Sequence, residues 1–304
     1  MTSEYRHIPV LLPECMKYLK LSEGKTYVDA TLGGAGHSLE AAKLIGPTGH
    51  LLGIDQDDVA RAAASERLAA LPDDVRPEVD VLAGNFGELD SLLVSAQIPS
   101  IDAILFDIGV SSVQIDTPSR GFSFKETGPL DMRMDPSNQT LTAAEIVNTY
   151  TAADLARVIR HYSDEKWASR IADFIVAARE EAPLTSSEQL VDVIKAAVPA
   201  SARRAGGHPA KRTFQALRID VNSEFEVLEE LLEKLPDALA PGGKVAILTF
   251  HSGEDRLVKH AFKYGKKVGI YSDVAKDVIR PSKEECAQNG RAKSTKMRWA
   301  IKVK

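Results

Sequence analysis

Apolar runs bounded by turn residues recur along this chain, and each has the length of a buried strand. Five of them lie at Tyr27–Leu32, His50–Asp55, Glu78–Ala83, Ile101–Asp107 and Lys244–Phe250. Helical patterns separate the first four runs, as at Asp57–Leu71. This alternation of strands and helices predicts a doubly wound α/β sheet. The segment Met297–Val303 alternates apolar and polar side chains and predicts one further strand.

About 135 residues separate the fourth run from the fifth, whereas a crossover between parallel strands needs only about a dozen. Four stretches in this gap have the period of amphipathic helices: 142–150, 152–162, 166–181 and 187–198. Thr142, Thr151 and Ser186 are placed to begin three of them. A helix over Arg212–Leu235 and a tight turn then lead to the fifth strand. We therefore predict a sheet domain of residues 1–109 and 209–304, and an inserted small helical domain of residues 110–208.

The first predicted strand runs into a glycine-rich turn, Leu32–His37, and the second ends on an acid. Glycines let a backbone turn tightly and approach a ligand closely. Asp55 lies 19 residues after Gly36, and an acid at this spacing accepts hydrogen bonds from ribose hydroxyls in nucleoside-binding folds. No run fits G-x-G-x-x-G, which argues against NAD and leaves room for S-adenosylmethionine (SAM). The alternative is an ordinary tight turn and a solvated Asp.

Polar residues also follow the later strands, at the edge where open α/β sheets bind ligands. Asp107 ends the fourth strand, and the loop 120–135 beyond it is dense in Gly, Arg, Asp, Met and Phe. We expect this loop to face a substrate, with a packed Ω-loop as the alternative. Phe86 follows the third strand, where its ring would lie over adenine, unless it is a plain core aromatic.

A Phe-His-Ser-Gly-Glu-Asp run follows the fifth strand, at residues 250–255. It brings Ser, His and Asp together, as a hydrolase would require. The chain has no G-x-S-x-G elbow, however, and the side chains of the neighbouring His251 and Ser252 would diverge. A hydrolase is therefore disfavoured.

Charge is unevenly distributed. Residues 256–304 carry 14 Lys and Arg against 4 Asp and Glu, although the whole chain has a formal net charge of −5. A second basic cluster surrounds His208: Arg203, Arg204, Lys211, Arg212 and Arg218. Basic segments on an otherwise acidic protein predict contact with a polyanion backbone. A solvated, lysine-rich tail is the alternative.

Composition narrows the class of protein. With 304 residues and 44% hydrophobic content, the chain can bury a substantial core in one or two domains. No apolar run reaches the roughly 18 residues of a membrane span, and the first residues lack a signal-peptide pattern. Cys15 and Cys286 lie far apart, so we expect reduced thiols in a cytoplasmic protein and no metal site.

Several long strings resemble the RsmH family, also called MraW. They are residues 7–14, 32–38, 107–112, 120–124, 129–135, 209–219 and 241–243. The resemblance extends from His7 to the C-terminus. It implies a Rossmann-like, SAM-dependent methyltransferase that methylates the N4 amine of a decoding-centre cytidine in 16S ribosomal RNA. The partner would be 16S rRNA within the small ribosomal subunit, and the oligomeric state is left open.

The resemblance also assigns cofactor-binding roles by position, to Ala35, Gly36, His37, Asp55, Phe86, Asp107 and Gln114. The turn Ala35–His37 would hold the methionine end of SAM, and Asp55 would bind the ribose hydroxyls. Phe86 would contact the adenine, while Asp107 and Gln114 would complete the pocket. One departure is Gly253, where the family usually has Leu, and this Gly is expected to make its turn more flexible.

Methylation of an amine needs a group that accepts its hydrogens. Asp107, a backbone carbonyl, or the hydroxyl of Ser111 or Ser112 are the candidates. RNA phosphates are expected to contact Arg203, Arg204, Lys211 and Arg212 and the basic C-terminal segment. Two other classes stay open, namely a nicotinamide-dependent oxidoreductase on the same fold and a non-enzymatic RNA-binding module.

Overall fold

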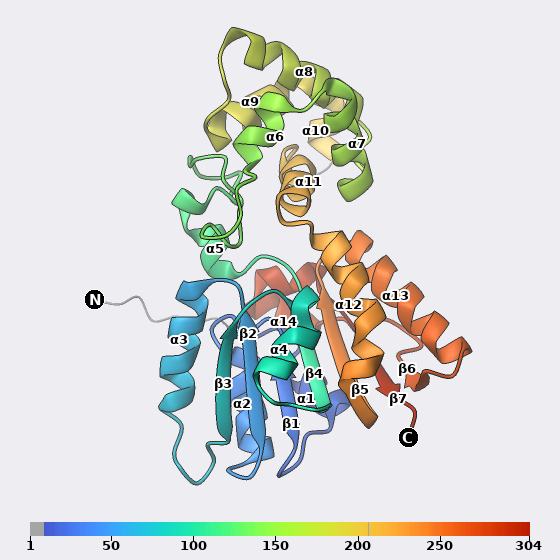
Figure 1. Cartoon of the computed structure of the whole chain (residues 1–304). Coiled ribbons are helices and arrows are strands. Elements are labelled where there is room, and N and C mark those ends of the chain that lie inside the picture. Colours follow the sequence, from blue (N-terminus) through green and yellow to red (C-terminus); the bar gives the residue numbers. More distant parts are fainter. Residues whose placement is uncertain (1–8, 206) are drawn as a thin grey trace. The chain divides into compact units, whose positions relative to one another are not determined.

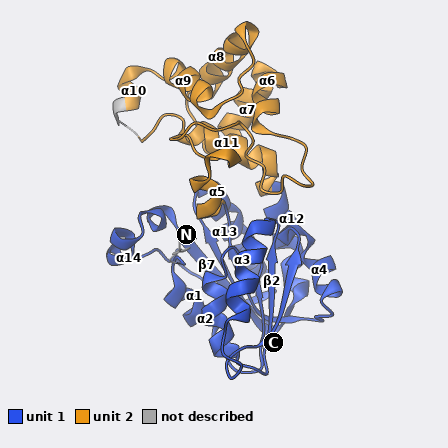
Figure 2. Ribbon diagram, turned by 90° about the vertical axis from the view of Figure 1, so that its left-hand side faces the viewer, with its two compact units in different colours: residues 1–109, 226–304 blue, residues 110–225 orange. Residues whose placement is uncertain are grey.

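The computed structural model describes residues 9–205 and 207–304, without the side chains of residues 204 and 205. The chain divides into two compact units (Figures 1 and 2). Unit 1 comprises residues 1–109 and 226–304, and unit 2 comprises residues 110–225.

Unit 1 contains a seven-stranded sheet in the order β3-β2-β1-β4-β5-β7-β6. The strands are β1 (Thr26–Asp29), β2 (His50–Asp55), β3 (Glu78–Ala83), β4 (Ile101–Asp107), β5 (Leu239–Thr249), β6 (Tyr271–Val274) and β7 (Lys296–Lys302). Strands β1 to β5 are parallel, and β7 and β6 are added antiparallel. The doubly wound α/β prediction is confirmed. The sequence did not predict β6, a short strand in which Ser272 and Asp273 are exposed.

Helices cover both faces of this sheet. They are α1 (Leu12–Leu19), α2 (Gly36–Ile45), α3 (Asp58–Ala69), α4 (Leu89–Ser95), α12 (Glu224–Ala238), α13 (Ser252–Lys267) and α14 (Lys283–Gln288). Successive strand residues point to opposite faces, so Val28 joins a core with α4, α12 and α13 while Tyr27 joins a core with α1, α2 and α3. Because both faces are buried, the strands read as continuous apolar runs.

Unit 2 is helical and has its own core. Its helices are α5 (Ser112–Asp116), α6 (Ala143–Thr149), α7 (Ala152–Ser163), α8 (Ala168–Glu181), α9 (Ser187–Ala197), α10 (Ala200–Ala205) and α11 (Lys211–Asn222). Thr142, Thr151 and Ser186 are N-caps, each accepting a hydrogen bond from the backbone N–H three residues later. The helix starts predicted from the sequence are therefore confirmed.

The helix expected over Arg212–Leu235 is instead two helices, because Ser223 adopts the left-handed conformation and ends α11. The apolar side of α11, including Phe214 and Leu217, is buried in the unit 2 core. This packing places the division between the units after Phe225, rather than at residue 208. Within the described residues, no helix combines the length and apolar character needed to cross a membrane.

Candidate functional site

Three strands of unit 1 end on an aspartate, and parallel pairing brings these ends to one edge of the sheet. Asp29 ends β1, Asp55 ends β2 and Asp107 ends β4. Asp29 is paired in register with Gly53 on one side and Leu105 on the other. Ligands of open α/β sheets bind at this carboxyl edge, so the three acids mark the candidate site.

The backbone of the turn after β1 has a conformation that lets a ligand approach it closely. Gly33 and Ala35 both have left-handed backbones, with φ of +49° and +60°. A Cβ on Gly36 would lie 3.2 Å from the Cβ of Pro9, so this position is also tight. The imidazole of His37 is buried, with Nε2 3.0 Å from the carbonyl oxygen of Val10. The backbone of the turn, rather than the His37 ring, is thus left to meet a ligand.

Asp55 joins the first two strand ends. Its Oδ2 accepts a hydrogen bond from the backbone N–H of Gly33 at 2.8 Å, and its Oδ1 accepts one from Asp57 at 2.9 Å. Burial raises the pKa of Asp55 to about 6, against the lowering effect of these two bonds. The carboxylate is therefore held in one orientation beside the glycine turn.

Asp107 differs from the other two acids in having an unused oxygen. Asp29 is bonded by the Ser38 hydroxyl at 2.6 Å and by the backbone N–H of Thr31 at 3.3 Å. In contrast, Oδ1 of Asp107 is buried and bonds to no described residue. Burial raises the pKa of Asp107 to about 6; His37 lowers it, and the charges of Asp29 and Glu254 raise it further. Oδ1 of Asp107 is therefore an available acceptor at this edge.

These pKa values predict how the stability of unit 1 depends on pH. Asp107 titrates near 3.8 when unfolded and at about 6 when folded, so the folded state binds the extra proton and is weakened as pH rises between these values. A pKa difference of two units between the folded and unfolded states corresponds to roughly 3 kcal/mol in the free energy of unfolding. We expect Asp107→Asn to gain stability relative to wild type as pH rises from 4 to 7, measured by urea unfolding. A constant difference across this range would contradict the prediction.

Phe86 lies at the exit of β3 and is fixed from both sides. Its neighbours Asn85 and Glu88 form a capping box, in which Gly87 N–H donates to Asn85 Oδ1 at 3.0 Å and Asn85 N–H donates to Glu88 Oε2 at 3.1 Å. The half-buried Phe86 ring packs edge-on against Phe106, with centroids 5.9 Å apart. Phe86 is thus partly a core aromatic and also borders the candidate edge.

The His-Ser-Gly-Glu run after β5 is a helix cap. Nδ1 of His251 accepts from the N–H groups of Gly253 and Glu254, and Oε2 of Glu254 accepts from Phe250 N–H at 2.8 Å. His251 Nε2 lies 2.8 Å from Oε1 of Glu254, which is 1% exposed. Gly253 lies inside α13, so its turn is a regular helix start. The spacing of cap and Glu, three residues apart, was the signal that sequence reasoning overlooked.

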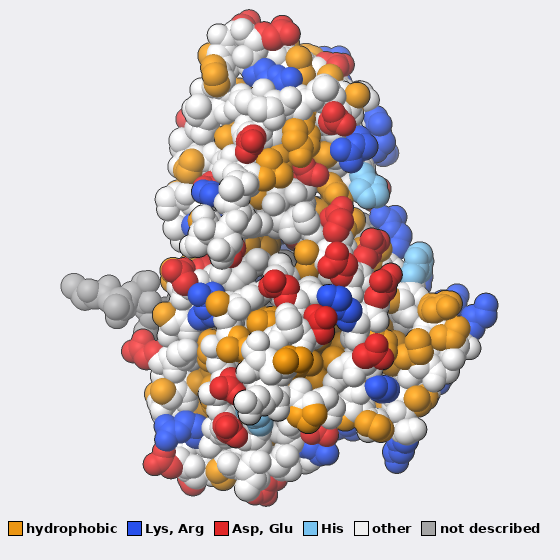
Figure 3. All heavy atoms as spheres, viewed as in Figure 1, with side chains coloured by type: hydrophobic (Ala, Val, Ile, Leu, Met, Phe, Trp, Pro, Cys, Tyr) orange, Lys and Arg blue, Asp and Glu red, His pale blue; other side chains and the backbone are white. Residues whose placement is uncertain are grey.

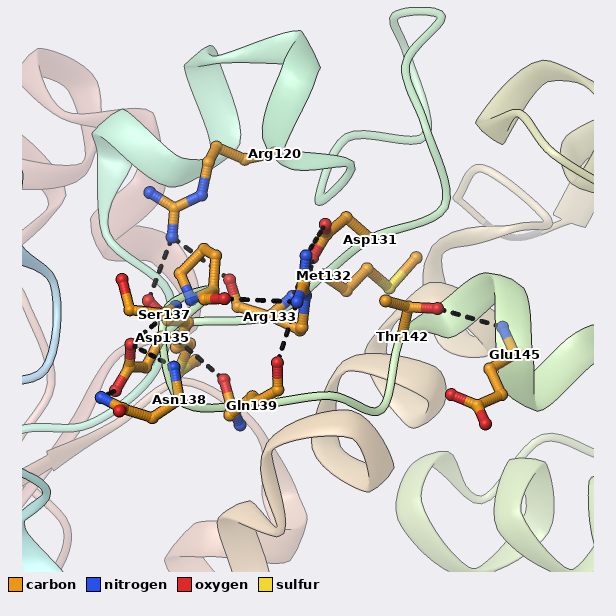
Figure 4. Close-up of polar contacts among 12 residues, drawn as sticks. Arg120, Asp131, Met132, Arg133, Asp135, Ser137, Asn138, Gln139, Thr142 and Glu145 are labelled. Carbon is orange, nitrogen blue, oxygen red and sulfur yellow. Dashed lines mark hydrogen bonds and ion pairs between the residues drawn. The ribbon is translucent and has the colours of Figure 1, made fainter.

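The predicted substrate-facing loop of unit 2 is closely tied to itself (Figure 4). The Arg133 guanidinium pairs with both oxygens of Asp131, at 2.8 and 2.7 Å, and also donates to the carbonyl of Gln139 at 2.8 Å. Arg120 donates to the carbonyl oxygens of Arg133 and Met134. These bonds favour the alternative of a packed Ω-loop for this part of the chain.

Ser111 and Gln114 form the cap of α5 in unit 2. The Ser111 hydroxyl accepts from Gln114 N–H at 3.2 Å, and Gln114 Oε1 accepts from Ser111 N–H at 2.9 Å. Gln114 is buried, while Ser112 begins the helix and is half-buried. The cap fixes these side chains a few residues after Asp107 in the chain.

Unit 2 also contains the four individual residues predicted to contact RNA phosphates, namely Arg203, Arg204, Lys211 and Arg212. Arg203, Lys211 and Arg212 are exposed, and the Arg204 side chain lies outside the described residues. Arg212 has a long ion pair with Glu165, at 3.8 Å. Arg218, in contrast, pairs with Glu224 at 2.7 Å and is largely buried.

Nearly the whole chain is similar to known proteins. The profile of the MraW methylase family matches residues 4–303. Ribosomal RNA small subunit methyltransferase H 2 of Agathobacter rectalis is 45% identical over 311 residues, covering 97% of this chain and 98% of that protein. Ribosomal RNA small subunit methyltransferase H of Symbiobacterium thermophilum is 45% identical over 314 residues, covering 98% and 97%.

Among solved structures, the chain matches a SAM-dependent O-methyltransferase of Thermotoga maritima, with a TM-score of 0.44 and 11% identity over 99% of this chain and 69% of that one. Another is fibrillarin of Aeropyrum pernix in complex with S-adenosyl-L-methionine, with a TM-score of 0.40 and 10% identity over 95% and 74%.

Proposed function

This chain belongs to the MraW methylase family, and we propose that it transfers a methyl group to the N4 amine of a decoding-centre cytidine in 16S ribosomal RNA. Its cofactor is S-adenosyl-L-methionine. Relatives that are 45% identical and named for the small-subunit ribosomal RNA support this substrate. The observation that carries the chemistry is Oδ1 of Asp107, a buried oxygen at the carboxyl edge of the sheet that bonds to no described residue. Such a substrate places the enzyme in the cytoplasm.

The residues at this edge fit the cofactor. Among the described residues, each oxygen of Asp55 accepts one backbone hydrogen bond, and a carboxylate oxygen has a second lone pair to offer a ribose hydroxyl. We infer that the backbone of the turn Ala35–His37 holds the methionine end of SAM and that Phe86 contacts the adenine. Bound SAM supplies an electrophilic methyl group on a sulfonium sulfur.

Asp107 is proposed to act on the nucleophile. The lone pair of the cytosine amine is delocalised into the ring, so the amine needs an acceptor for its hydrogens and a fixed orientation. Correct placement contributes up to about 7–11 kcal/mol to such reactions. Oδ1 of Asp107 is the acceptor we favour, with the hydroxyls of Ser111 and Ser112 as further candidates. The target base must leave its stack to reach this edge.

Phosphate contacts are proposed on two surfaces. In unit 2 they are Arg203, Arg204, Lys211 and Arg212. In unit 1 they lie in the basic C-terminal segment, where Lys296 and Arg298 share the single carboxylate of Asp255 at 3.5 and 2.7 Å. We take α13 as the part of this segment to test.

Helix α13 has exposed basic side chains that form no ion pair with a described residue: Arg256, Lys259, Lys263 and Lys267. Helix α12 is the opposite, with exposed Glu226, Glu229, Glu230 and Glu233, and Figure 3 shows acidic side chains gathering over it. A solvated surface would intersperse both signs of charge. This segregation therefore favours a polyanion along α13.

Charge reversal tests these phosphate contacts. We expect Lys259→Glu with Lys263→Glu, and separately Lys211→Glu, to weaken RNA binding and to flatten its salt dependence by roughly 0.7 per lost contact. SAM affinity should not change. The matched control is Lys20→Glu, an exposed residue close to Lys244 at the amino end of the β4–β5 pairing. Equal losses in the control and test variants would point to net charge alone.

The activity itself is tested by transfer of a labelled methyl group from SAM to small ribosomal subunits, followed by nucleoside analysis. Label in N4-methylcytidine is the expected result. Label in another nucleoside would overturn the proposed base, and no label with intact SAM binding would favour a non-catalytic RNA-binding module. Binding of NAD in place of SAM would favour an oxidoreductase.

A further inference from the structure

A stacked pair of aromatic rings lies on unit 2, formed by Phe124 and His208. Their ring centroids are 4.7 Å apart and their planes are inclined by 23°. Phe124 is half-buried and packs edge-on against Phe214, a residue of the unit 2 core, with centroids 6.0 Å apart. His208 is exposed. The core therefore supports Phe124, and Phe124 supports one face of the imidazole.

The His208 ring is fixed and neutral. Its Nδ1 accepts a hydrogen bond from the backbone N–H of Ala210 at 3.3 Å, which leaves the ring proton on Nε2, and no described residue accepts it. Burial, then the charges of Lys195 and Lys125, hold the pKa of His208 below its usual value. His208 therefore presents an uncharged imidazole ring whose Nε2–H is available as a hydrogen-bond donor.

The surroundings of the pair are basic. Lys125 follows Phe124 directly, is exposed and forms no ion pair with a described residue. Lys195 is close enough to affect His208, although it also pairs with Asp192 at 3.2 Å. Exposed Lys211 begins α11 just after His208. Aromatic rings among cations are typical of surfaces that bind unpaired nucleotides, where the rings stack on bases and the cations meet phosphates.

We propose that the Phe124–His208 pair is a stacking platform for one unpaired base of the substrate RNA, with Lys125 and Lys211 contacting the neighbouring phosphates. This inference rests on the proposed function, which supplies RNA as the substrate. The hydrogen bond from Ala210 N–H in the turn before α11 needs only Nδ1 of His208. It does not account for an exposed ring stacked on an aromatic from a distant part of the chain.

Two variants separate the role of the His208 ring from that of its Nδ1 acceptor. His208→Phe keeps a ring and loses the Nδ1 acceptor, whereas His208→Asn keeps a short acceptor and loses the ring. Stacking on an aromatic accounts for roughly a tenfold or larger effect on affinity per base. We expect His208→Asn to weaken binding of a single-stranded oligocytidylate about tenfold and His208→Phe to stay within about twofold of wild type. Loss in the Phe variant with retention in the Asn variant would assign His208 to the turn before α11 and overturn the platform.

A fluorescent reporter tests stacking directly. His208→Trp, made in a Trp167→Phe background to remove a tryptophan that is 37% exposed, should be quenched by oligocytidylate. Inorganic polyphosphate, which has charge but no bases, should bind without quenching. RNA binding without quenching would overturn the proposal. The proposed function is tested separately, because wild-type enzyme must label ribosomal subunits whether or not this platform exists.

Discussion

Replacing Asp107 with Ala should reduce methyl transfer by roughly a hundredfold or more, the size of effect expected when a positioned proton acceptor is removed. The fold should survive with equal or greater stability. Oδ1 of Asp107 makes no hydrogen bond to a described residue, and its charge is repelled by Asp29 and Glu254. Removing a carboxylate whose Oδ1 is buried and bonds to no described residue relieves desolvation and repulsion. The two readouts are single-turnover methylation and the free energy of unfolding of the same preparation.

Asp102 provides the matched control, since it lies on the same strand at its other end. It pairs with Lys25 at 2.9 Å and accepts from Thr26 N–H at 3.0 Å. Asp102→Ala should lose a little stability and keep the wild-type turnover. Wild-type methylation by Asp107→Ala would remove Asp107 from the chemistry. Unfolding of this variant would instead make the carboxylate a structural group.

The sheet could be predicted because side chains alternate between the two faces of a strand and both faces of this sheet are buried. Tyr27 and Val28 are neighbours, are both fully buried and point to opposite faces, so burial on two faces leaves a continuous apolar run. The end of each run then places Asp55 and Asp107 at the ligand edge without further information. Strand β6 escaped this reasoning because only Tyr271 of its four residues is buried.

The division between the units could not be predicted as well. Apolar positions over 212–235 have one helical period, and nothing in that period shows that Phe214 faces the helical core while Leu228 faces the sheet. The left-handed backbone at Ser223 ends the first helix and separates the two faces. A serine at this position does not by itself predict a left-handed conformation. The same holds for the stack of Phe124 on His208, which depends on tertiary packing alone.

The sequence located the polar residues near the carboxyl edge of the sheet but did not show the role of each. His251, Ser252 and Asp255 suggested a triad by residue type, yet His251 caps α13 and Asp255 pairs with Arg298. Backbone donors at a helix start need acceptors, and this requirement explains the run without any catalytic role. Asp107 is distinguished by the opposite property, an acceptor that no described residue uses.

Replacing Asp55 should weaken SAM binding strongly. Two ribose hydroxyls would lose a charged acceptor, and a hydrogen bond to a charged group contributes about 1.5–3 kcal/mol, so we expect at least a tenfold rise in the dissociation constant of Asp55→Ala. Part of this change would come from the glycine turn, because Gly33 N–H also loses its partner at Oδ2. Asp55→Asn separates these effects, since an amide keeps one acceptor oxygen but carries no charge. Titration calorimetry is the measurement.

The pH dependence of SAM binding gives Asp55 a signature that a damaged turn would not reproduce. Its pKa in the free protein is raised to about 6 by burial, and only the ionised carboxylate offers both oxygens as acceptors. Wild-type affinity should therefore rise as pH increases through about 6 and level off above it. In Asp55→Asn that contribution disappears, and the dependence that remains is due to other groups, Asp107 with its pKa of about 6 among them. Control variant Asp57→Ala removes the N-cap of α3 and a charge that raises the pKa of Asp55. It should lower stability by about 1 kcal/mol and keep the pH dependence of SAM binding, with the midpoint shifted to lower pH. If Asp55→Asn bound SAM with the wild-type affinity and pH profile, the ribose contact would have to be assigned to another residue.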